Sequence, residues 1–233
     1  MKRVVLALGG SIIAPPGDPD PQSLIQWTEA VKEWSRDVQP LVVVGGGDPA
    51  RKAIDLARHA STIEDDLDLI GIAATRLNAN VFLTFLKGNG VDTYHHVPRT
   101  VETATQKADQ NDVVVMGGTV PGHSTDYVAA TLAKECGADR VVIVTNVDGV
   151  YSADPNKDSA AKRFDHLDHD ELIDIVGSRW TSAGAKTVVD GPCAKYLKQH
   201  GIEACVVSGR NLTNVGKAVR GRPFDGTRIG GKA

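Results

Sequence analysis

Short apolar runs rich in β-branched residues recur along the chain and alternate with longer amphipathic stretches. The runs are continuous rather than interrupted by polar residues, which is typical of parallel strands covered on both faces. Strands are predicted at Val4–Leu8, Leu41–Val44, Val113–Met116, Val141–Thr145 and Ala204–Ser208. The alternation of strands with helical stretches therefore predicts an α/β fold, a three-layer αβα sandwich around a mostly parallel central sheet.

The first amphipathic stretch carries clear helix signals. Asp20 fits an N-cap, Pro21 suits the first turn, and apolar residues follow at spacings of three and four. Trp27 and Trp34 lie on this apolar face, so both are expected in the core. Further helices are predicted at Asp68–Lys87, at Thr125–Glu135 with Gly137 as the stop, and at Asp168–Val176, Pro192–His200 and Leu212–Val219.

Length and composition limit the class of protein. The 233 residues suit one folding unit, with a soft lobe boundary near Gly137. A formal net charge of −3 gives no broad cationic surface, so nucleic acid is not expected as a partner. The cysteines Cys136, Cys193 and Cys205 form no zinc-type pair and are interpreted as buried thiols.

The apolar start of the chain imitates a signal peptide only superficially. Gly9 and Gly10 interrupt it, and no small-residue cleavage site follows. No run in the sequence approaches the roughly 20 apolar residues of a membrane span. A cytoplasmic protein without a membrane partner is expected.

Two glycine clusters follow the first two predicted strands. Gly9–Ser11 ends one strand and Gly45–Gly47 ends the next. Open α/β sheets bind ligands at the carboxyl ends of their strands, and glycine lets backbone N–H groups approach phosphate oxygens closely. Each cluster alone could equally be a tight turn. Neither a dinucleotide fingerprint nor a Walker loop is present.

Two further clusters follow the third and fourth strands. Residues Gly117–Asp126 open a helix, whose free N–H groups suit an anion, although Ser124 or Thr125 could simply cap it. Residues Thr145–Pro155 combine small and polar side chains with Gly149. The alternative for this last segment is an Asx turn closed by Gly149.

The order of these motifs is similar to that of the amino acid kinase superfamily. The resemblance rests on Gly-Gly-Ser at Gly9–Ser11, on the Val-Gly-Gly-Gly turn at Val44–Gly47, and on Thr-Asn-Val-Asp-Gly-Val-Tyr-x-x-Asp-Pro at Thr145–Pro155. Within the superfamily, Ile70–Ala79 and Gly117–Asp126 resemble the archaeal uridylate kinases most. Many members carry a lysine two residues before Gly-Gly-Ser, where this chain has Ala7 and Leu8, and the archaeal uridylate branch shares the loss of that lysine.

The resemblance implies transfer of a phosphoryl group from ATP to UMP, with Mg²⁺. It implies an acceptor lobe over about 1–136 and an ATP lobe over about 137–233. The implied ATP-binding residues are Gly10, Ser11, Gly47, Arg51, Thr145, Asn146, Tyr151 and Asp154. The implied UMP-binding residues are Gly46, Asp68, Thr119, Val120, Pro121, Gly122, His123, Ser124 and Thr125. The implied catalytic residues are Gly10, Arg51, Asp126 and Lys186, and no protein metal site is implied.

Elementary chemistry agrees with this scheme. A nucleoside monophosphate is largely dianionic at neutral pH and needs no general base, so catalysis reduces to positioning and positive charge around the γ-phosphoryl group. Arg51 suits bidentate phosphate contact, with a solvated helix arginine as the alternative. For Asp68 and Asp126 the alternatives are a favourable helix-dipole charge and ordinary capping, and for Lys186 an exposed loop lysine.

Two other functions remain open on sequence alone. One is a kinase of another small acid, such as isopentenyl phosphate, a carbamate or an acylated amino acid. The other is a nucleotide-binding storage or sensor protein similar to the molybdenum storage proteins. The resemblance further implies a homo-oligomer, a hexamer built from dimers. Ile70, Ala73, Ala74, Leu77 and Val81 give the second long helix an apolar face, which could contact another subunit or could simply belong to the core.

Overall fold

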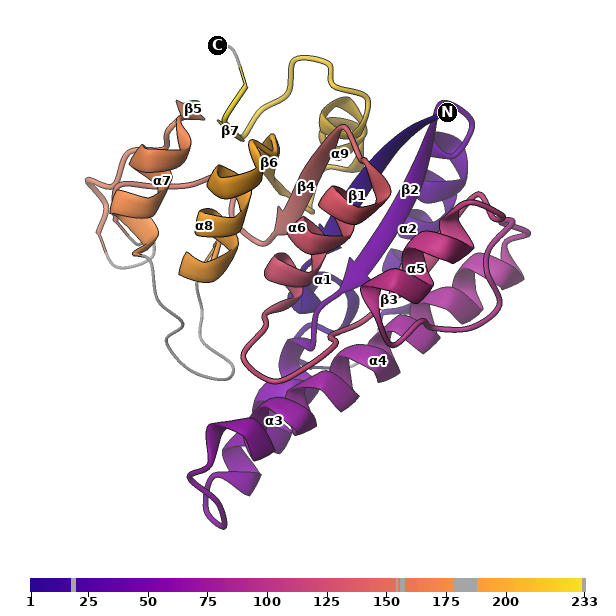
Figure 1. Ribbon diagram of the computed structural model, residues 1–233, viewed down its shortest axis with the longest axis horizontal. Helices are drawn as coiled ribbons and strands as arrows, with labels where there is room; N and C mark the ends of the chain where they lie inside the picture. Colours follow the sequence, from indigo (N-terminus) through magenta and orange to yellow (C-terminus); the bar gives the residue numbers. More distant parts are fainter. Residues whose placement is uncertain (18–19, 154, 156–157, 178–187, 232–233) are drawn as a thin grey trace.

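A seven-stranded sheet forms the centre of the protein (Figure 1). The computed structural model describes residues 1–17, 20–153, 155, 158–177 and 188–231. The strand order is β3-β2-β1-β4-β6-β7-β5, in which β1, β2, β3, β4 and β6 run parallel and β7 pairs antiparallel to β6. The strands are β1 (Lys2–Leu8), β2 (Val38–Val44), β3 (Val114–Met116), β4 (Arg140–Thr145), β5 (His166–Leu167), β6 (Ala204–Ser208) and β7 (Thr227–Ile229).

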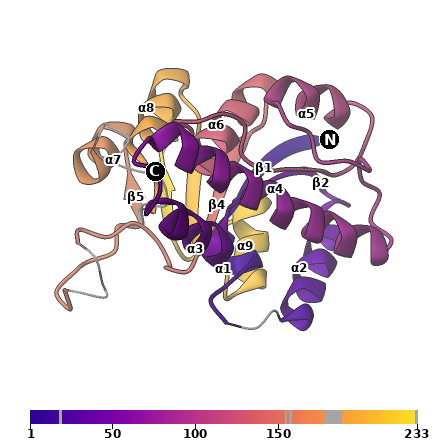
Figure 2. The same cartoon turned by 90° about the horizontal axis from the view of Figure 1, so that it is seen from below.

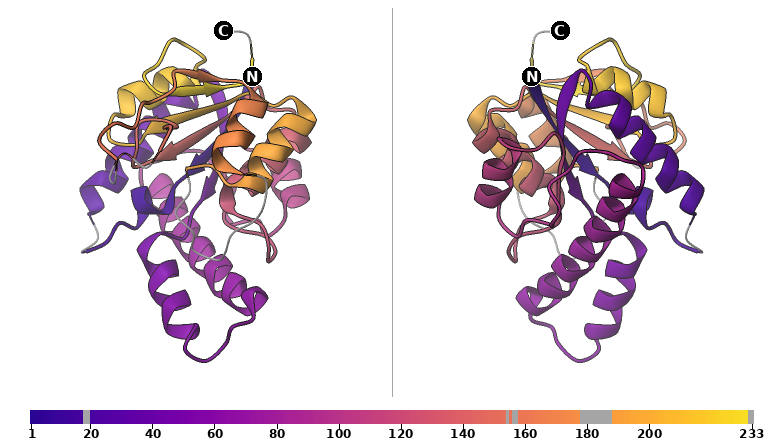
Figure 3. Two further views of the ribbon diagram at one scale, coloured as in Figure 1. Left: turned by 90° about the vertical axis from the view of Figure 1, so that its left-hand side faces the viewer. Right: turned by 90° about the vertical axis from the view of Figure 1, so that its right-hand side faces the viewer.

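Helices cover both faces of this sheet. They are α1 (Gly10–Ile13), α2 (Pro21–Trp34), α3 (Gly47–Ala57), α4 (Glu64–Gly88), α5 (Val101–Ala108), α6 (Thr125–Cys136), α7 (His169–Val176), α8 (Gly191–His200) and α9 (Leu212–Val219). Buried residues of α2, α4 and α9 form one core with one face of the sheet, and those of α5, α6, α7 and α8 form a second core with the other. Figure 3 shows these layers edge-on, with α3 and α4 projecting below them.

The cores confirm the main expectations from the apolar pattern. Alternate residues of β1 enter opposite cores, with Val4 and Leu6 on one side and Val5 on the other. Trp27 and Trp34 are buried in edge-to-face contact, their ring centroids 6.1 Å apart. All three cysteines are free and buried. The structure is thus the predicted three-layer αβα sandwich with a mostly parallel sheet.

Local signals set most helix ends. The side chain of Asp20 accepts a hydrogen bond from Gln22 N–H at the start of α2, and Asp168 forms a complete capping box with Glu171 at the start of α7. Gly137 adopts the left-handed conformation, with φ of 63°, where α6 ends. Each of these ends agrees with the sequence prediction to within a residue or two.

The structure differs from the prediction where such signals are missing. α4 begins at Glu64 rather than at Asp68, because its N-cap position is Ile63, which offers no side-chain cap, and acidic residues fill its first turn. α1, α3, α5, β5 and β7 were not predicted. Four of these five are eight residues or shorter, too short for a clear period, and α3 begins inside the glycine cluster.

α4 has apolar residues on both sides. Leu67, Phe82 and Leu86 are fully buried, whereas Leu69 and Leu77 are 55% and 60% exposed. Among the described residues, this one helix has the length and composition of a membrane span, with a mean hydropathy of 1.4. Core helices of water-soluble proteins can share that composition.

Candidate functional site

The carboxyl ends of the parallel strands meet along one edge of the sheet, which faces α3 and α4 (Figures 1 and 2). The glycine loops after β1 and β2 lie side by side there, because Gly9 N–H donates to Val144 O at 2.9 Å and Gly45 N–H donates to Leu8 O at 2.9 Å. The segments that begin at Gly117 and Thr145 leave the same edge after β3 and β4. The structure thereby brings together all four segments that the sequence singled out.

The two glycine loops touch through their backbones. A Cβ atom placed on Gly10 would lie 1.9 Å from the Gly47 nitrogen, and one on Gly45 would lie 2.5 Å from the Gly10 nitrogen. Gly47 also has a φ of +64°, which L side chains rarely adopt. No other residue type fits at Gly10 without separating the loops.

Several backbone N–H groups at this edge are left free. They are those of Gly10, Gly46, Gly47, Thr125 and Asp126, which donate to no acceptor within the described part of the chain. Gly47 belongs to the first turn of α3, and Thr125 and Asp126 belong to the first turn of α6. The helix dipole adds a partial positive charge at both helix starts. Such an edge favours a phosphate anion.

Arg51 adds a full positive charge beside these donors. It lies on α3 one turn after Gly47 and is half-buried. Its neighbour Lys52 is paired with Asp48 at 2.7 Å, but Arg51 has no hydrogen bond or ion pair with any residue that the structure describes. The guanidinium is therefore available to a ligand.

The β3–α6 loop, residues 117–124, is held by α4. Thr75 Oγ1 accepts a hydrogen bond from Gly118 N–H at 2.7 Å. The Arg76 guanidinium donates to Gly118 O at 3.1 Å and to Thr119 O at 3.0 Å. Asp68 Oδ2 accepts from Gly122 N–H at 2.6 Å. Three side chains of one helix thus fix the loop from Gly118 to Gly122.

α4 also holds the loop after β2. Asn78 is only 4% exposed, and its side-chain amide donates to Gly45 O and Gly46 O at 2.9 Å each. We assigned no role to Thr75, Arg76 or Asn78 from the sequence. The signal was present, since Thr75 and Asn78 are polar residues on a helix face that otherwise carries core residues such as Phe82.

Asp68 has one oxygen left for a ligand. Its Oδ2 holds Gly122 N–H, while Oδ1 has no partner among the described residues. The residue therefore supports the loop, a role that the resemblance did not include, and it could still accept a hydroxyl proton. Val120, on the same loop, is 49% exposed.

The start of α6 is tied to α8 by a pair of caps. Ser124 Oγ accepts from Tyr127 N–H at 2.9 Å and donates to Asp190 Oδ2. Asp190 Oδ1 accepts from Cys193 N–H at 2.9 Å, which caps α8. Ser124 is thus a helix cap, as one of the two sequence interpretations had it. Asp190 was not identified from the sequence, although Asp before Gly-Pro is a helix-start signal.

Asp126 lies in the first turn of α6, partly buried. Burial and the nearby charge of Asp190 raise the pKa of Asp126 to about 8. Burial also raises the pKa of Asp190, against the hydrogen bonds from Ser124 and Cys193. His123 stacks at 4.3 Å on Tyr127, and partial burial lowers the pKa of His123 while Asp190 opposes that shift. A protonated Asp126 adds no negative charge to the edge.

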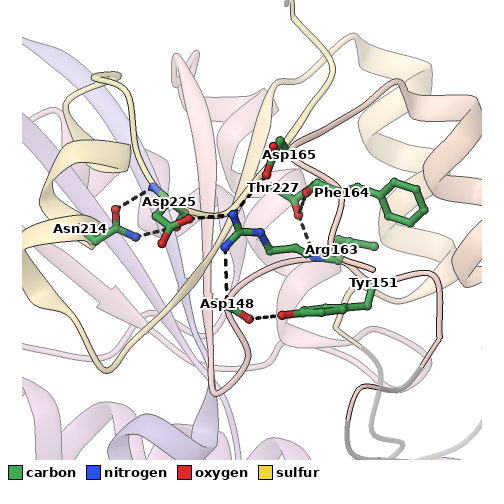
Figure 4. A network of polar contacts seen from close by, with 9 residues as sticks. Asp148, Tyr151, Arg163, Phe164, Asp165, Asn214, Asp225 and Thr227 are labelled. Atoms are coloured by element: carbon green, nitrogen blue, oxygen red, sulfur yellow. Dashed lines mark hydrogen bonds and ion pairs between the residues drawn. The ribbon is translucent and has the colours of Figure 1, made fainter. Parts of the chain in front are cut away.

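The segment after β4 is held by a separate polar network (Figure 4). Tyr151 OH donates to Asp148 Oδ1 at 2.6 Å, and this bond is the main cause that lowers the pKa of Asp148. Arg163 pairs with Asp148, Asp165 and Asp225 at 3.3, 3.1 and 2.7 Å. The network anchors the Tyr151 side chain beside the ends of β4 and β6.

Two predicted site residues, Asp154 and Lys186, lie outside the described residues. Thr145 and Asn146 stand at the end of β4, Asn146 exposed, with Thr145 Oγ1 donating to Asn146 Oδ1 at 3.3 Å. Within the described ranges, His, Cys, Asp and Glu side chains form no cluster of three suited to a metal ion.

Comparison with known proteins identifies the family of this chain. The sequence model of the amino acid kinase family matches residues 2–208. The uridylate kinase of Natronomonas pharaonis is 40% identical over 228 residues, 97% of this chain and 98% of the relative. That of Methanocaldococcus jannaschii is 38% identical over 232 residues, 98% of this chain and 100% of the relative.

Solved structures give the same relationship. The crystal structure of uridylate kinase from Archaeoglobus fulgidus matches with a TM-score of 0.85 and 39% identity, covering 98% of this chain and 100% of that chain. The UMP kinase of Bacillus anthracis matches with a TM-score of 0.81 at 18% identity, which shows the shared fold. The fold, the glycine-rich edge and these relatives together establish that the chain belongs to the amino acid kinase family.

Proposed function

We propose that the protein transfers the γ-phosphoryl group of ATP to UMP, giving ADP and UDP. The observation that carries this proposal is the cluster of free backbone N–H groups from Gly10, Gly46, Gly47 and the first turn of α6 at one edge of the sheet. Relatives of about 40% identity over nearly the whole chain are named uridylate kinases, which supports the choice of acceptor.

The edge suits the transfer step chemically. The oxygen of a dianionic acceptor phosphate attacks the γ-phosphorus of ATP, the bond to the β,γ-bridging oxygen breaks, and ADP leaves. The difficulty is the mutual repulsion of two polyanions. Backbone N–H groups and the unpaired Arg51 supply positive charge there without having to break other hydrogen bonds first.

We assign the two nucleotides to the two sides of this edge. UMP contacts Gly46, Asp68 and the β3–α6 loop through Thr125, with Asp68 Oδ1 taking a ribose hydroxyl. The phosphates of ATP contact Gly10, Ser11, Gly47 and Arg51. The remainder of the ATP molecule contacts Thr145, Asn146 and Tyr151. The network around Arg163 supports the assignment of Tyr151, because it holds that side chain at the ends of β4 and β6. Asp154 and Lys186 remain predictions from the sequence.

Mg²⁺ fits the site as a partner of the nucleotide. The described residues offer no dedicated carboxylate cage, and Mg²⁺ in kinases is commonly held mainly by phosphate oxygens and water. When bound, the ion neutralises charge on the β- and γ-phosphates. Asp126 is the carboxyl group at the start of α6 that could orient it or its waters. Three free, buried thiols fit the reducing cytoplasm in which we place the reaction.

We also propose that α4 contacts a second copy of this chain. Leu69, Ala73, Leu77 and Val81 recur every fourth residue and are all exposed, so they form one apolar ridge along the helix. Exposed apolar ridges of this length in a water-soluble enzyme commonly mark protein contacts. The hexamer implied by the resemblance would use this ridge for one of its contacts.

A substrate panel tests the reaction itself. With ATP and Mg²⁺, we expect ADP release with UMP to exceed release with CMP, AMP, isopentenyl phosphate and acetylglutamate by at least about tenfold, because the site is built around a nucleotide phosphate and ribose. Coupled detection of ADP gives the rates. Equal or faster turnover of a non-nucleotide would assign another kinase of the family, and UMP binding without turnover would indicate a storage or sensor protein.

Replacement of Asp68 by alanine tests the acceptor assignment. Loss of a charge-assisted hydrogen bond should weaken UMP binding by roughly 1–3 kcal/mol while ATP binding hardly changes. Titration calorimetry measures both nucleotides. Asp65→Ala, an exposed aspartate in the preceding turn of α4, is the matched control and should bind UMP like the wild type. Equal losses for UMP and ATP would mean that Asp68 only supports folding.

The pH dependence of stability tests the raised pKa of Asp126. Between about pH 4 and pH 8 the unfolded chain ionises this group and the folded, nucleotide-free protein keeps it protonated, so its contribution to stability falls as pH rises. In Asp126→Asn the side chain cannot ionise, so this decrease in stability with rising pH disappears. We expect denaturant unfolding to show the variant stabilised by several kcal/mol near pH 8 and hardly at all near pH 4, because each pKa unit between 3.8 and about 8 corresponds to about 1.4 kcal/mol.

Asp190, whose charge raises the pKa of Asp126, and His123, which interacts with Asp190, are present in both proteins, so only the difference in stability between wild type and variant is interpreted. A difference that stays constant from pH 4 to pH 8 would show that Asp126 is already ionised in the folded protein. Steady-state assays of Asp126→Asn should show a lower kcat, because the superfamily role of this acid is to orient charged groups at the transfer site.

Sedimentation velocity tests whether the apolar ridge on α4 forms a contact between subunits. Leu77→Glu places a charge in the middle of it and should shift the protein toward smaller species, because a buried unpaired charge costs several kcal/mol. Ile175→Glu, at a 37% exposed position on α7, is the matched control and should sediment like the wild type. A wild-type protein that sediments as a monomer at working concentrations contradicts the oligomer.

A further inference from the structure

Asp190 joins two helices that lie far apart in the sequence. Its side chain is buried, and each carboxylate oxygen holds one donor: Oδ1 takes Cys193 N–H at the start of α8, and Oδ2 takes the hydroxyl of Ser124 at the start of α6. One residue therefore connects the N-caps of both helices. Ser124 is also the last residue of the β3–α6 loop.

The Ser124 hydroxyl has no proton to spare for a ligand. A serine hydroxyl carries one proton, and here it points to Asp190, while a lone pair accepts Tyr127 N–H. Ser124 is consequently a fixing point for α6 rather than a donor to the acceptor phosphate. This refines the expectation from the resemblance that Ser124 binds UMP directly.

A carboxylate is an unfavourable choice for capping α8 alone. A serine or asparagine caps a helix with one acceptor oxygen and no charge, and Asp190 is buried beside a second carboxyl group, Asp126. The exposed caps Asp20 and Asp168 carry no such cost. What Asp190 offers beyond a neutral cap is a second acceptor, and that acceptor holds Ser124.

The anchored segment is the one that faces the acceptor. The free N–H groups of Thr125 and Asp126 follow Ser124 directly. Tyr127, in the same turn, packs edge-to-face on Tyr196 of α8 at 5.2 Å, and His123 stacks on Tyr127. The first turn of α6 is thus fixed against α8 by one polar and one aromatic contact.

We propose that Asp190 is a positioning residue for the acceptor site. By holding Ser124, it fixes the end of the β3–α6 loop and the first turn of α6 where their N–H groups meet the acceptor phosphate. The proposal rests on the proposed transfer to UMP, and it adds the N-cap residue of α8 to a site otherwise built from α3, α4, α6 and the strand ends.

The test compares two capping aspartates. Asparagine replaces one acceptor oxygen with an NH₂ donor, so Asp190→Asn can still cap α8 but loses the charge-assisted bond from the Ser124 hydroxyl. If the new amide donates to Ser124 Oγ instead, the hydroxyl proton must turn away from residue 190. We expect the KM for UMP to rise about tenfold, the KM for ATP to stay within about twofold, and kcat to fall less than the KM for UMP rises. Asp168→Asn caps α7 without contact to the loop and should leave both KM values unchanged.

A double-mutant cycle separates positioning from loss of stability. Ser124→Ala alone should also raise the KM for UMP, and adding Asp190→Asn to it should change little more, because both act through one contact. Calorimetric titration of UMP without ATP gives a second readout. Wild-type UMP affinity in Asp190→Asn, or in Ser124→Ala should Asp190→Asn not fold, would overturn the proposal, as would fully additive effects.

The same variants distinguish a failure of the proposed UMP phosphorylation from a failure of the positioning role of Asp190. Wild-type protein that fails to phosphorylate UMP contradicts the proposed function. If it phosphorylates another acceptor, the KM of that acceptor takes the place of the KM for UMP in the comparison, and an unchanged value in Asp190→Asn then contradicts the positioning role alone.

Discussion

The close approach of the loops after β1 and β2 is the constraint on which the rest of the site depends. The two strands are paired along seven residues, up to Leu8 opposite Val44. Strand spacing in a sheet is about 4.8 Å, so the loops begin in contact and only glycines let them continue side by side. A Cβ on Gly10 would overlap the Gly47 nitrogen. Because no side chains intervene, the backbone N–H groups of both loops remain accessible at the sheet edge.

α4 turns this contact into a fixed site. Asn78 holds the loop after β2, while Thr75, Arg76 and Asp68 hold the β3–α6 loop. Buried polar groups that lose their partners cost about 1–3 kcal/mol each, so the loops cannot move away from α4 without a substantial penalty. The apolar ridge of Leu69, Ala73, Leu77 and Val81 lies on the opposite side of the same helix.

The sequence predicted the elements that carry strong local signals and missed those that depend on tertiary contact. Continuous β-branched runs gave the five parallel strands, and caps such as Asp20 and Gly137 gave the helix ends. The two strands β5 and β7 have two and three residues and depend on tertiary pairing: β7 pairs with β6, and β5 pairs with β7. No pattern of period two can be read from so few positions.

The same distinction applies to the site. Glycine clusters at strand ends predicted the edge at which the candidate site lies, and the structure brings them together as parallel strands require. The anchoring side chains were not assigned, because their role depends on which loop lies opposite. Asp190 follows Ser124 by 66 residues, and nothing local in either segment indicates that their side chains meet.

The charges around the acceptor loop suggest how an anion site tolerates three acids. Asp68 and Asp190 each accept hydrogen bonds from the loop or from helix starts, and burial together with the charge of Asp190 raises the pKa of Asp126 to about 8. Each N–H group that serves a carboxylate, such as that of Gly122, is withdrawn from the ligand. The acceptor phosphate must therefore be met by the N–H groups that remain free, at the glycine loops and in the first turn of α6. Asp68 and Asp190 thus fix the backbone in place, and the backbone, together with Arg51, supplies the positive charge.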